Sequence, residues 1–200
     1  MLRRMLLVAP VVLGGCAVLN QPYVEPRRYP LLPRRPGQRA GRAGRKTLLV
    51  RSTGAAPGLE SRLLPTLQPN GTMSVEYYAE WTAPPAGAAE EALRTWLIDS
   101  GLFSAVLAPG TRGPVDLLLE SQLVALHIDL ARGVAVASMS AVVMRETGQF
   151  GTQVVGQISE TATVPVPPDR PLGPDAQAAG MVAALGAVLA KIEARIARHA

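Results

Sequence analysis

The chain has 200 residues, of which 48% are hydrophobic, 18% are charged and 4% are aromatic, and its formal net charge is +5. This length allows one ordinary domain plus an additional segment, and the hydrophobic content excludes a wholly disordered protein. A single cysteine excludes an intramolecular disulfide framework and any zinc site made of several thiolates. The low aromatic content disfavours a surface on which nucleic-acid bases stack.

The positive charge is concentrated at the N-terminus. Residues 1–15 hold two basic residues and no acidic one, and residues 16–46 hold eight basic residues against one acidic. Residues 47–200 hold ten basic and fourteen acidic residues, so the body of the protein is mildly acidic. The excess of basic residues lies in an N-terminal targeting segment and a linker, and not in the folded domain. We therefore expect no nucleic-acid partner.

Residues 1–15 are typical of a bacterial lipoprotein signal peptide. Two arginines precede an apolar run that is shorter than the roughly 20 residues of a membrane-spanning helix. The run ends in Leu13-Gly14-Gly15-Cys16, which resembles the lipobox: a large aliphatic residue, two small residues and an obligatory cysteine. Leu13, Gly14 and Gly15 would be recognised by the signal peptidase, and Cys16 would carry acyl chains such as palmitate. The alternative is a plain signal peptide or N-terminal anchor with an incidental cysteine.

The residue after the cysteine bears on localisation. Residue 17 is Ala rather than Asp, which by the enterobacterial sorting rule predicts the periplasmic face of the outer membrane. The periplasmic face of the inner membrane is the alternative. A cysteine with more than one acyl chain anchors a protein stably, whereas a single chain does not.

Residues 16–46 are rich in proline, arginine and glycine and show no helical or strand periodicity. This composition predicts a disordered tether that starts at the lipidated cysteine and holds a folded domain away from a membrane. Its arginines would be able to contact lipid phosphates. The alternative interpretation is a solvated linker without a role of its own.

Residues 47–200 read as one α+β domain, a mainly antiparallel sheet of about four to five strands with two helices covering one face. Each strand is identified by apolar alternation or a short apolar run between turn residues, and each helix by an apolar stripe at spacings of three and four. The predicted strands are residues 46–52, 72–82, 103–107, 116–130, 134–146 and 153–164, and the predicted helices are residues 86–100 and 175–198.

Strand 72–82 alternates clearly between two faces. The apolar face holds Met73, Val75, Tyr77, Ala79 and Trp81, and we expect these side chains to pack in the core. Tyr78 lies on the opposite face between two glutamates, which makes it the candidate for contact with a partner. An ordinary exposed or inter-strand tyrosine is the alternative for Tyr78.

The sequence contains no catalytic constellation. It has no glycine-rich nucleotide motif and no GxSxG nucleophile motif. His127 and His199 stand apart from other ligand types, and Cys16 would be consumed by its thioether bond. The sequence therefore predicts no enzyme, no cofactor and no bound metal.

The segment from Ser74 to Val106 resembles the core signature of the ABC-type transport auxiliary lipoproteins, which accompany MCE-type lipid-transport systems of Gram-negative bacteria. The matching features are the pair Tyr77-Tyr78, Trp81, a proline turn, an amphipathic helix and a Ser100-Gly101 stop followed by Phe and Val. The order of lipobox, linker, strands and closing helix is similar as well.

This resemblance implies a non-catalytic role in lipid traffic between the inner and outer membranes. The implied partners are an MCE-domain protein, a permease and an ATPase, with the lipoprotein docking the conduit at the outer membrane, and a homo-oligomer is left open. Three alternatives compete with this hypothesis: an outer-membrane assembly lipoprotein unrelated to MCE transport, a periplasmic binding module, and a periplasmic enzyme of unidentified type.

Overall fold

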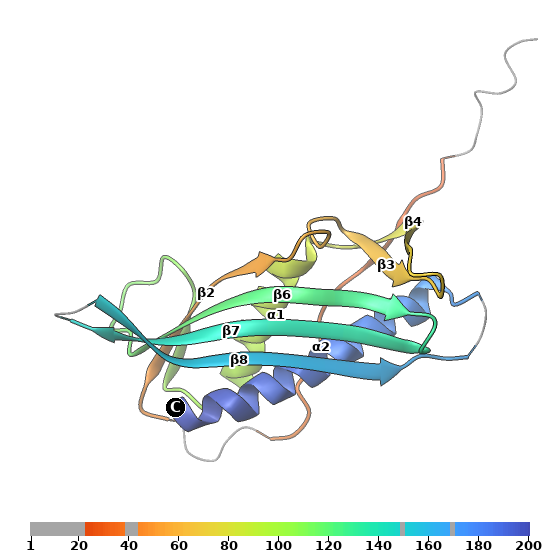
Figure 1. Cartoon of the computed structure of the whole chain (residues 1–200). Helices are drawn as coiled ribbons and strands as arrows, with labels where there is room; N and C mark the ends of the chain where they lie inside the picture. The colour runs from red at the N-terminus through yellow and green to blue at the C-terminus, as the bar shows by residue number, and fades with distance from the viewer. Residues whose placement is uncertain (1–22, 39–43, 149–150, 169–170) are drawn as a thin grey trace, which may run out of the picture.

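The computed structural model describes residues 23–38, 44–148, 151–168 and 171–200. Within these residues the chain forms one eight-stranded mixed sheet, and both helices lie on the same face of it (Figure 1). The elements in chain order are β1 (Arg27–Tyr29), β2 (Thr47–Ala55), β3 (Leu63–Leu67), β4 (Met73–Trp81), α1 (Pro85–Ser100), β5 (Ala105–Leu107), β6 (Leu117–Asp129), β7 (Val134–Thr147), β8 (Gly151–Pro165) and α2 (Pro174–Ile196).

Strand β6 is the centre of the sheet. Along one edge, β6 pairs with β7, and β7 in turn pairs with β8. Along its other edge, β2 pairs with the first half of β6 and β3 pairs with its last two residues. Beyond them, β5 flanks β2, whereas β4 and then β1 extend the sheet outward from β3.

The prediction of a mainly antiparallel sheet of four to five strands is wrong. The sheet has eight strands, and four of its seven pairings are parallel: β1–β4, β2–β5, β2–β6 and β3–β6. Helix α1 lies in the connection that leads from β2 back to β5 and β6, and a connection that crosses the sheet through a helix joins parallel strands. The β6–β7–β8 meander is antiparallel, as strands joined by short turns must be.

Two strands, β1 and β3, are absent from the sequence-based prediction because both contain or adjoin prolines. Pro65 stands in the middle of β3 and removes a hydrogen-bond donor, which argues against a strand when only the sequence is read. β1 lies between Pro26 and Pro30, inside the segment expected to be disordered. Each strand pairs with a partner that is distant in the sequence, β1 with β4 and β3 with β6.

The two helices agree with the prediction and form the rest of the core. The apolar stripe of α2 is fully buried and consists of Met181, Leu185, Val188, Leu189, Ile192 and Ile196. Helix α1 ends at Gly101, whose φ of 68° is the left-handed conformation of a glycine C-cap. Gly180 of α2 permits a close approach to the sheet, because a Cβ there would lie 3.2 Å from that of Ala135.

Candidate functional site: the N-terminal strap and the aromatic strand

The predicted lipobox residues Leu13, Gly14, Gly15 and Cys16 lie outside the described residues, so the lipid anchor stays a prediction. The described part of the chain begins at Tyr23, seven residues after the cysteine. From there the site consists of two neighbouring parts. We call residues 27–38 the strap, and we refer to β4 as the aromatic strand.

The strap begins as β1, which pairs in parallel with the end of β4, so that Arg27 lies opposite Ala79 and Tyr29 opposite Trp81. The Tyr29 hydroxyl donates a hydrogen bond of 2.6 Å to Asp175, at the start of α2, and Arg27 forms an ion pair of 3.2 Å with the same carboxylate. Burial, and then the hydrogen bond to Asp175, raise the pKa of Tyr29. The beginning of the strap is therefore tied to the sheet and to α2 together.

The middle of the strap packs into the core. Leu31 is 1% exposed, whereas the adjacent Leu32 is 61% exposed. The strap then passes over α2 at Gly186, where an added Cβ would lie 3.3 Å from the Cβ of Pro33 and 3.9 Å from the ring of Trp96. Glycine at this position of α2 lets the strap and α1 approach the helix closely.

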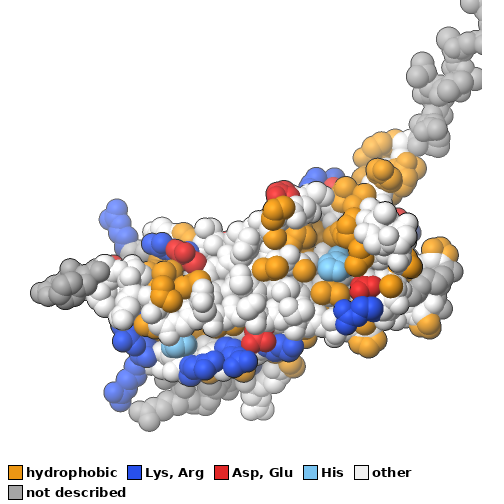
Figure 2. Space-filling model, viewed as in Figure 1, with side chains coloured by type: hydrophobic (Ala, Val, Ile, Leu, Met, Phe, Trp, Pro, Cys, Tyr) orange, Lys and Arg blue, Asp and Glu red, His pale blue; other side chains and the backbone are white. Residues whose placement is uncertain are grey.

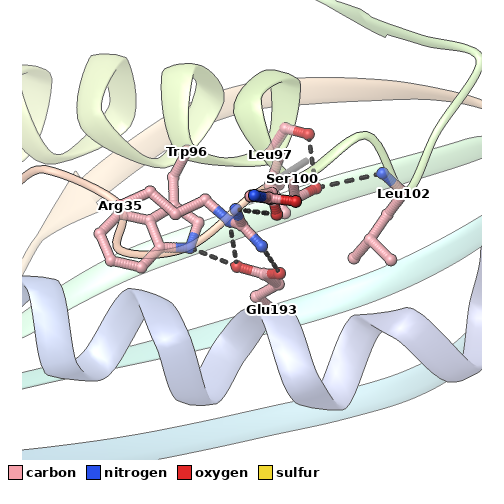
Figure 3. A network of polar contacts seen from close by, with 7 residues as sticks. Arg35, Trp96, Leu97, Ser100, Leu102 and Glu193 are labelled. Atoms are coloured by element: carbon pink, nitrogen blue, oxygen red, sulfur yellow. Dashed lines mark hydrogen bonds and ion pairs between the residues drawn. The ribbon is translucent and has the colours of Figure 1, made fainter. Parts of the chain in front are cut away.

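The strap is held further along by a polar clasp, which we define as Arg35, Trp96 and Glu193 (Figure 3). Two guanidinium nitrogens of Arg35 donate hydrogen bonds of 2.9 and 2.7 Å to the two carboxylate oxygens of Glu193, on α2. The indole nitrogen of Trp96, on α1, donates a bond of 2.7 Å to the same carboxylate. A bidentate pair of this kind is among the stronger polar contacts in proteins.

The clasp shifts the pKa of Glu193 downward. The hydrogen bonds from Arg35 are the largest cause, the bond from Trp96 acts in the same direction, and partial burial opposes them. The Glu193 carboxylate in turn raises the pKa of Arg35. Both groups are therefore charged at neutral pH, and their side chains are only 14% and 18% exposed.

The strap corrects the prediction that the whole segment between the cysteine and the domain is a disordered tether. Residues 27–29 form a strand, and Leu31 and Arg35 bind to the folded body. The run Tyr29-Pro30-Leu31-Leu32 is an apolar signal within this basic segment that could have indicated packing. Arg35 and Glu193 are 158 residues apart, and no local pattern connects them.

The aromatic strand divides into a buried and an exposed half. Ala79 and Trp81 are 1% and 0% exposed, as predicted, and Trp81 Nε1 has no hydrogen-bond partner among the described residues. The prediction that Met73, Val75 and Tyr77 pack in the core is wrong, since they are 55%, 37% and 79% exposed.

The register of β4 explains this division. Residues 76–79 of β4 stand opposite the single residue Leu64 of β3, because the register shifts between Leu63 and Pro65. Such a bulge interrupts the ladder and turns the strand away from its previous course. β1 covers the outer edge of β4 only from Ala79 to Trp81, so the described chain places no strand against that edge before Ala79.

Tyr78, the predicted partner contact, lies in the bulge and is 58% exposed. Its ring is therefore accessible from solvent, and so is that of the neighbouring Tyr77. Strand β4, which contains Tyr78, lies at the end of the molecule from which the chain enters β1 (Figure 1). Its role as a contact residue stays a prediction.

The two histidines are separate and lie outside this site. Burial lowers the pKa of His127 against an opposing effect of Asp129. Burial also lowers the pKa of His199, and the charges of Arg198, Lys46 and Arg145 act in the same direction. The described residues contain no group of three or more His, Cys, Asp or Glu side chains arranged to bind a metal ion.

A shallow apolar groove of about 440 Å³ lies between the strap and the outer side of α2. Its lining includes Pro33, Trp96, Val182, Gly186 and Ala187, and none of the residues predicted to be functional. In the part of the chain that the structure describes, neither helix combines the length and the apolarity that crossing a bilayer requires.

Neither a protein-family model nor a curated protein matches the chain. Among solved structures, the chain is similar to protein XCC0632 from Xanthomonas campestris, described with the family model DUF330, with a TM-score of 0.70 and 21% identity over 86% of this chain and 95% of that one. An uncharacterized protein matches with a TM-score of 0.58 and 15% identity, over 88% of this chain and 98% of the other. The hypothetical protein CT253 from Chlamydia trachomatis matches with a TM-score of 0.52 and 10% identity, over 77% and 96% of the respective chains. At these identities the likeness establishes a shared fold.

Proposed function

We propose that the chain is a non-catalytic lipoprotein that docks the conduit of an ABC/MCE-type lipid-transport system at the outer membrane. The observation that carries this proposal is the strap, which connects the segment after the lipobox directly to the sheet and to both helices. A force applied at Cys16 would reach the core through β1, Leu31 and the clasp. This arrangement suits a domain that has to stay in place beside a membrane while it binds a partner.

The sequence supplies two further supports. The lipobox at residues 13–16 predicts the membrane anchor, and the segment from Ser74 to Val106 resembles the signature of the transport auxiliary lipoproteins.

The anchor is tested by fractionation of cells that express the full chain or its Cys16→Ala variant. We expect the wild-type chain in the outer-membrane fraction and the variant, with unchanged thermal unfolding, in the soluble periplasmic fraction. Ala17→Asp is the matched control in an enterobacterial host, because it keeps the lipid but should move the protein to the inner membrane. A Cys16→Ala variant that still sediments with membranes would contradict the lipid anchor.

The transport role is tested separately by in-cell cross-linking followed by purification of the chain. We expect an MCE-domain protein among the products from wild-type cells, at a level that falls strongly with Cys16→Ala. Cross-linking to outer-membrane assembly proteins with no MCE-domain protein would contradict the transport role and leave the anchor standing.

A further inference from the structure

Large hydrophobic side chains are exposed mainly at one end of the molecule. Of the ten that are exposed in the described chain, six lie on β4 and on the segment just before the strap. We call these six the end patch: Tyr23, Val24, Met73, Val75, Tyr77 and Tyr78, with exposed fractions from 37% to 85%. Figure 2 shows hydrophobic side chains gathered where the N-terminal segment leaves the body. Clustered exposed apolar groups of this kind mark an interaction surface.

The direction of the strap places this end next to the predicted anchor. β1 runs parallel to β4 with Arg27 opposite Ala79, so the chain before Arg27 comes from the side of β4 that carries Tyr77 and Val75. Only eleven residue steps separate Cys16 from Arg27, which at about 3.5 Å each is at most about 40 Å. The opposite end of the molecule, where β7 ends and β8 begins, is separated from the end patch by most of the length of the sheet (Figure 1).

The arginines around the end patch are in ion pairs, and two acidic residues, Glu25 and Glu76, stand next to patch residues in the chain. Arg27 binds Asp175, and Arg28 and Arg62 both bind Glu80, at distances of 2.9 to 3.3 Å. Contact with a surface would therefore depend on apolar and aromatic groups, with little attraction to anionic lipids. Tyrosine rings suit the headgroup level of a bilayer, where one end is apolar and the other is wet.

We infer that the end patch rests on the surface of the bilayer that holds Cys16, with Tyr77 and Tyr78 at headgroup level. This inference depends on the lipid anchor of the proposed function. The short connection gives the patch a high effective concentration at the membrane, so weak contacts suffice. Penetration stops at the headgroups, because the outer edge of β4 before Ala79 carries backbone groups that hydrocarbon would leave unsatisfied.

The test uses the lipidated full-length mature chain in vesicles of phosphatidylethanolamine and phosphatidylglycerol. Since the only native thiol is consumed by the lipid, a new cysteine accepts a fluorescent label at a single place. Tyr77→Cys and Met73→Cys report on the end patch, and Val154→Cys, 59% exposed and near the start of β8, is the matched control. Quenchers attached to lipid headgroups should reduce the emission at residues 73 and 77 several-fold more than at 154, with little change in 0.5 M salt.

Three results would overturn the inference. Equal, weak quenching at all three positions while mass spectrometry shows acylated Cys16 would contradict the inference and leave the anchor intact. Shielding of residue 77 that rises with protein concentration, without lipid quenching, would assign the patch to a second copy of the chain. A mature chain that is purified from cells with an unmodified Cys16, and that does not bind the vesicles, would contradict both the inference and the anchor.

Discussion

The strap pairs with the last three residues of β4, and the exposed residues of β4 come just before them, yet the composition of each segment suggests the opposite of its burial. The strap is rich in proline and arginine and packs against the sheet and both helices. The first half of β4 alternates like a buried strand and is exposed. Burial here depends on which long-range partner is available, and composition alone does not determine it.

The largest effect is expected within β4 itself. Trp81 is fully buried, so Trp81→Ala should lower the free energy of unfolding by about 3–5 kcal/mol through lost packing and the cavity it leaves. Tyr77→Ala, four residues earlier and 79% exposed, should change it by less than about 0.5 kcal/mol. Urea denaturation of both variants measures this difference, and equal losses would show that the first half of β4 is packed as well.

The next largest effect is expected in the strap, where the neighbouring residues Leu31 and Leu32 differ in burial. Leu31→Ala should destabilise the domain by about 2–5 kcal/mol, because its side chain is buried. Leu32→Ala, which removes the same atoms from an exposed position, should be nearly neutral. The measurement is thermal unfolding in the Cys16→Ala background. Two neutral substitutions would mean that the strap does not contribute to the folded state.

A smaller, pH-dependent effect is expected from the clasp. Glu193→Gln should cost about 1–3 kcal/mol at pH 7, since it weakens hydrogen bonds to a charged group. The pKa of Glu193 is lowered in the folded state, so its contribution is complete above the ordinary carboxyl pKa and disappears as the pH falls through the folded-state value. The gap between wild type and variant should therefore begin to narrow below about pH 4.5 and vanish only below the lowered folded-state pKa.

The control for the clasp is Glu120→Gln. Glu120 forms an ion pair with Arg51 in which both side chains are about half exposed, and such pairs contribute roughly 0–1 kcal/mol. A loss at Glu120 as large as that at Glu193, or a Glu193 effect that persists at acid pH, would contradict a charged clasp.

Several elements were predictable from the sequence because their signals are local. The fully buried stripe of α2, the left-handed cap at Gly101 and the three strands of the meander follow from periodicity and turn residues. Strand β3 was not predictable, because Pro65 argues against a strand. The parallel pairings were not predicted either, because they depend on how the connection through α1 crosses the sheet, which no local pattern shows.

The candidate site was predictable only in part. Tyr78 was correctly expected to be exposed, whereas Tyr77 was assigned to the core because a bulge leaves no trace in an alternating pattern. The clasp joins residues 35, 96 and 193, and only the folded chain brings them together. The basic composition of residues 16–46 predicted that Arg35 is solvated. In the structure, Arg35 binds the Glu193 carboxylate on α2.

The most direct test of the strap as part of the fold is a disulfide between Pro33→Cys and Gly186→Cys in the Cys16→Ala background. A Cβ at residue 186 would lie 3.3 Å from that of Pro33, close to the spacing of disulfide-linked cysteines. We expect nearly complete intramolecular cross-linking on mild oxidation, with none for Pro33→Cys paired with Val154→Cys. Two thiols at 33 and 186 that stay as reactive as those of the control pair would contradict a packed strap.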